Sequence, residues 1–89
     1  MEILNKPIEM IALCGLNGEL RPLRFRYEDV GHHPQVVHIR EIISTKESLQ
    51  VGIQSFYYLC RATLQEKEQL FELRYTVKNH SWTLHRVVY

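Results

Sequence analysis

The length, composition and charge of the chain predict one small globular domain without a strong overall charge. Its 89 residues are 45% hydrophobic and 24% charged, which excludes a disordered or fibrous protein, and a chain of this size supports only one small core. The net charge of +1 gives no global field that would attract nucleic acid or an anionic membrane, so any electrostatic binding must be local.

The first residues and the two cysteines predict a cytoplasmic protein. Residues 1–7 lack a basic segment followed by a long apolar one, and no run approaches the roughly 18 apolar residues of a membrane span, so we expect neither export nor membrane insertion. Cys14 and Cys60 are too few and too distant for a disulfide framework or a zinc motif, which indicates reduced thiols packed as small hydrophobic side chains. Residues 1–7 themselves can be disordered.

A β-hairpin is predicted next, with its turn at Asn17-Gly18. Asn-Gly supplies the two positive φ values of a type I′ turn. The core-facing pairs are then Ala12 with Leu23, Met10 with Phe25 and Ile8 with Tyr27, and the solvent-facing pairs are Glu9 with Arg26 and Ile11 with Arg24. One face of this hairpin is therefore core, and the other is mostly solvated.

The middle of the chain is predicted to hold one strand between two loops. After a loop at residues 28–35, residues 36–43 form a β-branched strand with Val37, Ile39 and Ile43 on its core side. Glu41 falls on this same apolar side. Residues 44–55 leave room for only about a turn of helix before Gly52, so we expect a mobile loop there.

Two consecutive hairpins are predicted in the last third of the chain, and they share one inner face. A turn centred on Glu66-Lys67 pairs Phe56 with Val77, Tyr58 with Tyr75, Cys60 with Leu73 and Ala62 with Phe71. A turn at Asn79-His80 pairs Phe71 with Val88, Leu73 with Arg86, Tyr75 with Leu84 and Val77 with Trp82. Two independently placed turns thus bury the same side of residues 71–77, and a one-residue slip in either would turn that side outward.

The strands together predict an all-β fold. About six short strands without a convincing helix favour a small antiparallel barrel or a strongly curved sheet of about five to six strands. No internal repeat or linker divides the chain, so we expect residues 1–89 to form a single domain.

The outward faces of the strands carry the candidate binding residues. On the last three strands these are Tyr57, Arg61, Arg74, His85 and Tyr89, and on the first hairpin they are Arg24 and Arg26. Cations for phosphates together with aromatic rings for base stacking are the means by which other β domains bind single-stranded nucleic acid. The alternative is an ordinary solvated sheet face with cross-strand ion pairs, such as Arg61 with Glu72.

Arg86 is predicted on the inner face of the last strand. A buried guanidinium without a carboxylate would be several kcal/mol costly. We therefore expect a structural ion pair between Arg86 and Glu41, or else an Arg86 side chain that passes Trp82 to reach solvent.

Metal binding and catalysis are not predicted. The five histidines show neither a His-x-x-x-His spacing nor a Cys-x-x-Cys knuckle, so we expect no metal and no other cofactor. The sequence has no nucleophile elbow or glycine-rich phosphate loop, and it points to no small-molecule substrate. A thiol dyad of Cys14 or Cys60 with a histidine is the remaining enzymatic option, but the strand positions of both cysteines favour burial.

Four short motifs resemble a family of small uncharacterised bacterial all-β domains. They are Pro-Leu-Arg-Phe-Arg-Tyr at residues 22–27, Phe-Tyr-Tyr-Leu-Cys-Arg at 56–61, Leu-Phe-Glu-Leu at 70–73 and Trp-Thr-Leu-His-Arg-Val at 82–87. The resemblance spans most of residues 8–89, although the segment 29–34 is longer than the family pattern. Because some relatives are appended to translesion-polymerase-like proteins, the resemblance implies a role near DNA, and it implies no catalytic residues.

The sequence therefore predicts a non-enzymatic accessory module that binds a macromolecule, with single-stranded nucleic acid as the first candidate. The alternative is a protein-interaction or self-association module that uses an exposed strand edge or a patch of Leu59, Val87 and Tyr89. Both alternatives are compatible with a monomer or a weak homodimer.

Overall fold

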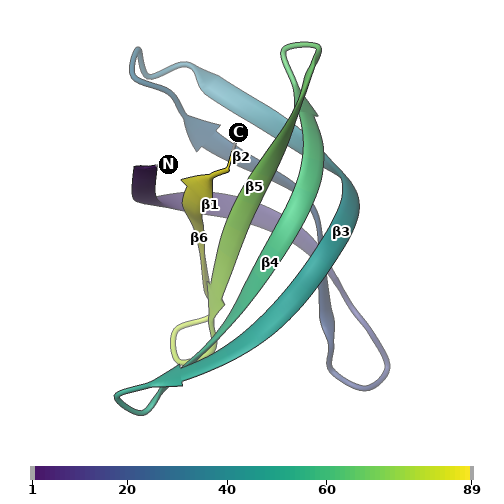
Figure 1. Ribbon diagram of the computed structural model, residues 1–89, viewed down its shortest axis with the longest axis vertical. Helices are drawn as coiled ribbons and strands as arrows, with labels where there is room; N and C mark the ends of the chain where they lie inside the picture. The colour runs from purple at the N-terminus through teal and green to yellow at the C-terminus, as the bar shows by residue number, and fades with distance from the viewer. Residues whose placement is uncertain (1, 89) are drawn as a thin grey trace.

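Six antiparallel strands follow one another around a closed barrel in the computed structural model, which describes residues 2–88 (Figure 1). The strands are β1 (Glu2–Cys14), β2 (Leu20–Glu28), β3 (Pro34–Gln50), β4 (Ile53–Leu64), β5 (Lys67–Thr76) and β6 (Ser81–Val87). Each strand pairs with the next, and β1 pairs with β6. The predicted all-β class is confirmed, and the sheet is a barrel. No helix that could cross a membrane occurs between residues 2 and 88.

The core consists of alternate side chains from β2 to β6. It contains Phe25, Val37, Tyr58, Cys60, Ala62, Phe71, Leu73 and Leu84. The rings of Phe25 and Phe71 meet edge to face with their centroids 5.8 Å apart, which joins β2 to β5 across the interior. Such a core follows from the period of two along a strand, because every second side chain points to the same face of the sheet.

The hairpin of β1 and β2 has much of its predicted register, but its turn differs from the predicted one. Gly18 (φ +84°) donates its N–H to the carbonyl of Gly15, so the turn lies one residue earlier than predicted, and it closes a three-residue loop. Pro22 rather than Leu23 is opposite Ala12. A bulge then absorbs Leu23, and Met10 with Phe25, Glu9 with Arg26 and Ile11 with Arg24 pair as predicted.

The turns of the last two hairpins also differ from the predicted ones, yet the predicted core face is retained. Gln65 and Glu66 both have positive φ, so the β4–β5 turn lies one residue earlier, and Tyr58 is opposite Leu73 rather than Tyr75. In the β5–β6 hairpin, residues 77–80 form the loop, and Tyr75 is opposite Trp82 rather than Leu84. Both pairings shift by two residues, in the second hairpin as far as the pair of Leu73 with Leu84, which keeps these side chains on their predicted faces because the period is also two.

Two segments that we expected to be disordered or mobile are strands. Residues 2–7 belong to β1 and pair with β6, apart from an irregularity between Ile3 and Lys6. Residues 44–55 form the end of β3 and the start of β4, joined by a two-residue turn at Val51-Gly52 with φ of +52° and +77°. Val in this left-handed conformation is uncommon, which explains why the sequence does not indicate a turn.

Two bulges in β3 change which of its apolar residues face the core. The pairing with β4 shifts between Ile39 and Glu41 and again between Ile42 and Ser44. Ile42 therefore packs against the core, and the predicted core residue Ile43 is exposed. The sequence of β3 alone does not indicate the bulges, because an extra residue is defined only relative to the strand that it pairs with.

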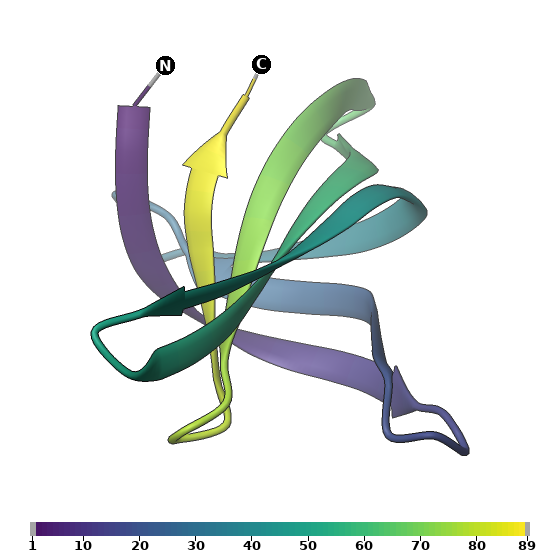
Figure 2. The ribbon, with the colours of Figure 1, turned by 60° about the horizontal axis from the view of Figure 1, so that its bottom comes forward.

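The distal half of β3 leaves the closed part of the barrel. Pairing of β2 with β3 ends at His38, whereas pairing of β3 with β4 continues from His38 to Gln50. Figure 2 shows the resulting hairpin, the β3–β4 arm (residues 43–57), crossing in front of β5 and β6. The turn of the arm lies beyond the last pair of β4 with β5, which is Ser55 with Thr76.

Candidate functional site: outer groove and free edge of β3

A groove runs over the outer side of β3, β4, β5 and β6. We call it the outer groove. Its lining includes Lys46 and Ser48 of β3, Tyr57 of β4, Glu72 of β5 and His85 of β6, and its volume is about 450 Å³. Strand alternation gives all of these side chains the same outward direction, and the twist of the sheet makes this outer face concave.

His85 lines the outer groove and contacts neighbouring strands. Its ring packs edge to face on Tyr57 at 5.2 Å, and its Nδ1 lies 2.7 Å from Asn5 Oδ1. Burial lowers the pKa of His85, and Arg74 and Arg86 lower it further, whereas Glu72 acts in the opposite direction. We therefore expect His85 to be a neutral, packed side chain at pH 7.

Arg86 also lies on this outer side, which corrects its predicted inward position and its predicted pairing with Glu41. A register shift in the β5–β6 ladder leaves His85 as the extra residue and brings Arg86 opposite Glu72. Arg86 Nε donates to Glu72 Oε1 at 2.9 Å. Glu41 instead forms an ion pair with Arg61, which also reaches Glu68 at 3.0 Å.

The structure brings together only some of the predicted binding residues. Tyr57 is directly opposite Arg74, and His85 contacts Tyr57, so these three form one cluster. Arg74 Nε is a buried donor for which residues 2–88 supply no acceptor. Arg61 is neutralised by two carboxylates, although neither is the predicted Glu72. Tyr89 lies outside the described residues.

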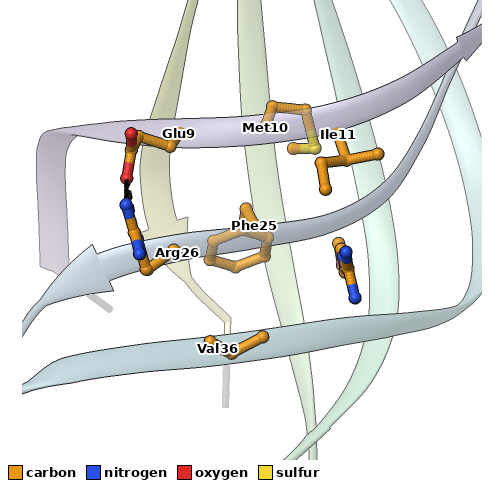
Figure 3. A pocket seen from close by; sticks show the side chains of 7 residues that line it. Glu9, Met10, Ile11, Phe25, Arg26 and Val36 are labelled. Atoms are coloured by element: carbon orange, nitrogen blue, oxygen red, sulfur yellow. Dashed lines mark hydrogen bonds and ion pairs between the residues drawn. The ribbon is translucent and has the colours of Figure 1, made fainter.

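Arg24 and Arg26 lie on another side of the barrel, beside a second pocket between β1, β2 and β3. Figure 3 shows Arg26 directed at Glu9, with which it forms an ion pair. The ring of Phe25 lies in the same view, between Met10 and Val36. Arg26 is thus partly neutralised, and the first hairpin presents a weaker basic strip than its sequence indicates.

The chemistry of the two thiols is set by their surroundings. Cys60 is buried in the core, and burial raises its pKa to about 12. Cys14 is exposed at the end of β1. Each Sγ contacts a main-chain carbonyl oxygen at 3.7 Å, rather than a histidine. Among residues 2–88 no three His, Cys, Asp or Glu side chains are grouped as metal ligands would be.

The feature that the sequence did not reveal is a free strand edge. From Ile39 to Gln50, β3 pairs with β4 on one side, and within the described chain no element covers its other side. The apolar side chains near this edge are also exposed, with Ile43 at 42% and Leu49 at 71%. The one sequence signal for this edge is Gly52, because a glycine between two apolar runs marks the turn at which β3 ends and β4 begins.

Comparisons with known proteins give no family assignment. No family model matches the chain, and neither the curated proteins nor the solved structures contain a match. The resemblance to small bacterial β domains therefore stays a prediction. The site must be interpreted from its own geometry.

Proposed function

We propose that this chain is a non-enzymatic interaction module that binds an extended segment of protein along the free edge of β3. The observation that carries this proposal is the one-sided pairing of β3 from Ile39 to Gln50. Unpaired N–H and C=O groups along a strand edge form a template for an added strand, which is a common mode of peptide recognition. The predicted patch of Leu59, Val87 and Tyr89 offers less exposed apolar surface to a partner, because Val87 packs against the core.

The β3–β4 ladder identifies the backbone groups that are free. Gln50 and Ile53 flank a two-residue turn and therefore form a hydrogen-bonded pair. Bonding to β4 then alternates along β3, so Thr45, Glu47 and Leu49 direct their N–H and C=O groups to the free edge. These three residues form the regular part of the binding template.

Removal of one edge donor tests the proposal. Extended peptides would be selected from a random library on the wild-type protein, and their affinity measured by fluorescence anisotropy. Thr45→Pro removes an edge N–H without removing a bond to β4, and we expect it to weaken binding by roughly tenfold, the effect of one lost hydrogen bond with added steric exclusion. Thr45→Val retains the N–H and should bind as the wild type does. Equal binding by Thr45→Pro would contradict the proposal.

Single-stranded nucleic acid in the outer groove is the second candidate. Its support is the buried Nε of Arg74, for which residues 2–88 supply no acceptor. Arg74 lines a hollow that adjoins the outer groove and shares Tyr57 with it, and Lys46 lines the groove itself. The implied link to translesion-polymerase-like proteins also supports it. Glu72 and the neutralised Arg61 weaken the phosphate-binding potential of this face.

An oligothymidine titration at low salt tests this second candidate. We expect Arg74→Gln to weaken binding and to reduce its salt dependence, because one phosphate contact is lost. Arg26→Gln, on the other side of the barrel, is the matched control and should bind normally. Absence of binding by the wild type at low salt would exclude nucleic acid from the groove.

A further inference from the structure

The free edge of β3 carries a charge pattern that is complementary to itself. Residues 40–47 are Arg-Glu-Ile-Ile-Ser-Thr-Lys-Glu. When two such segments run antiparallel about a point between Ile43 and Ser44, Arg40 is opposite Glu47 and Glu41 is opposite Lys46. Two copies therefore place four opposite-charge pairs across the junction, with uncharged residues at its centre.

We infer that the strand received by β3 is β3 of a second copy of this chain, in that register. This inference rests on the proposed strand-binding function and specifies the partner. The opposing pairs would be Arg40 with Glu47, Glu41 with Lys46, Ile42 with Thr45 and Ile43 with Ser44, each occurring twice about the two-fold axis. A symmetric interface of this kind is the usual way in which small proteins form dimers.

The bulges of β3 favour a second copy over an arbitrary strand. Because Ile43 is an extra residue in the β3–β4 ladder, the edge-facing residue that precedes Thr45 is Ile42, a spacing of three instead of two. A regular strand cannot match this spacing, whereas another β3 has the same spacing. In the inferred register Ile42 is opposite Thr45, so these two edge-facing residues meet each other twice about the two-fold axis. Edge-facing Glu47 meets Arg40, the extra residue of the other bulge, so the contribution of that pair is its opposite charge.

The side-chain faces agree with the same register. Ile42 pairs with Cys60 and Thr45 with Tyr58, which places both on the inner face of the sheet. Glu41 pairs with Arg61 and Lys46 with Tyr57, which places both on the outer face. The pairs Ile42 with Thr45 and Glu41 with Lys46 thus join residues that already share a face, as antiparallel pairing requires.

Two competing registers are disfavoured by charge. Pairing of Thr45 with Glu47 also aligns edge-facing groups, but it puts Lys46 opposite the second Lys46. Pairing of Thr45 with Leu49 puts Glu47 opposite the second Glu47. Like charges that are directly opposite each other destabilise a sheet, so these alternatives lose what the inferred register gains.

Charge exchange between two variants tests the inference. The acidic variant carries Arg40→Glu and Lys46→Glu, and the basic variant carries Glu41→Lys and Glu47→Lys. In sedimentation velocity at high protein concentration we expect a wild-type dimer, two monomeric variants, and a heterodimer when the variants are mixed in equal amounts. The control Arg24→Glu with Lys67→Glu has the same net charge change on exposed residues outside β3, and it should dimerise as the wild type does.

Disulfide trapping then tests the register with nearly native charges. In a Cys14→Ser background, an Ile43→Cys chain is mixed with a Ser44→Cys chain. These positions would be directly opposite, at a Cα separation of about 4.5 or 5.5 Å that suits a disulfide. The mixed disulfide should form readily, whereas Ile43→Cys with Lys46→Cys should not crosslink. Preferential crosslinking of the second pair would overturn the register.

The outcomes separate the two proposals. A wild-type monomer whose selected peptides still depend on the Thr45 N–H would overturn self-association and leave strand binding intact. A dimer that persists in both charge variants would overturn the inferred interface. A monomer whose peptide binding is unaffected by Thr45→Pro would overturn both proposals.

Discussion

The body of the barrel and the β3–β4 arm are built from the same kind of strand but are held in register by different forces. In the body, Phe71 and Leu73 are 1% and 0% exposed, so a one-residue slip would move large apolar side chains into water. Towards the tip of the arm, Leu49 and Val51 are 71% and 100% exposed, so the turn and the ladder rather than burial define the pairing there. Burial therefore fixes the body, whereas the arm retains a free edge that can bind a partner.

The largest expected effect is the difference in alkylation rate between the buried Cys60 and the exposed Cys14. At pH 8 a thiol with a pKa of about 12 is ionised to roughly one part in ten thousand, and the core also shields Cys60 from reagents. Iodoacetamide should therefore label Cys14 and leave Cys60 unmodified in the folded protein, as read by mass spectrometry. Both thiols should react in urea, and rapid labelling of Cys60 in the folded state would show that the body opens easily.

Truncation of one side chain in each region measures the contrast in stability. Phe71→Ala should lower the free energy of unfolding by about 3–5 kcal/mol, because it removes a buried ring at the contact with Phe25. Leu49→Ala should change it by less than about 0.5 kcal/mol, since that side chain is already in water. Urea unfolding compares the two, and equal losses would contradict the assignment of the core to the body.

The turn of the arm offers a stabilising substitution. Val51 has a β-branched side chain at φ +52°, a conformation that Asn tolerates better. Val51→Asn should stabilise the arm by about 1 kcal/mol, observed as roughly fivefold slower exchange of the amides that β3 bonds to β4, at Lys46, Ser48 and Gln50. The control Val30→Asn, on an exposed loop, should leave this exchange unchanged, and faster exchange in Val51→Asn would argue against the assigned turn.

The smallest expected effect is a pH dependence from His85, where the arm meets the body. Its folded pKa is lowered by burial, so the unfolded chain takes up a proton first as the pH falls. The contribution of His85 to the free energy of unfolding is complete above the unfolded pKa of about 6.5. It declines as the pH falls from there towards the lower folded pKa.

Replacement of His85 tests this sign. The free energy of unfolding, measured with urea, should fall less for His85→Gln than for the wild type when the pH is lowered from about 7.5 to about 5.5. His38→Gln, at an exposed position of β3, is the matched substitution and should keep the wild-type response. A wild type that becomes more stable on acidification would contradict the lowered pKa.

Much of the body could be predicted because alternation is a local property. Met10 with Phe25 and Glu9 with Arg26 follow from the sequence around the first turn, although the turn itself is displaced and a bulge at Leu23 restores the pairing. The later hairpins keep Tyr58, Leu73 and Tyr75 on the predicted side, because their pairings shift by two residues. A register error of two residues leaves each side chain on its predicted face, because the side-chain period along a strand is two.

The outer site was predicted less well because it depends on bulges and strand ends. Tyr57, Arg74 and His85 do come together, since they alternate outward on neighbouring strands. Arg86 faces Glu72 instead of Glu41 because one extra residue, His85, reverses the direction of all that follows it on β6. Such an insertion is defined only relative to the opposite strand.

The sequence by itself determined the all-β class and the face to which most core side chains point, because these follow from the spacing of apolar residues along each strand. Only the tertiary structure decided the ion-pair partners, the positions of the bulges and the length by which β3 extends past β2. These depend on contacts between residues far apart in the chain. The free edge of β3, on which the proposed function rests, exists because β2 separates from β3 after the pair of Arg24 with His38, while β3 continues to Gln50.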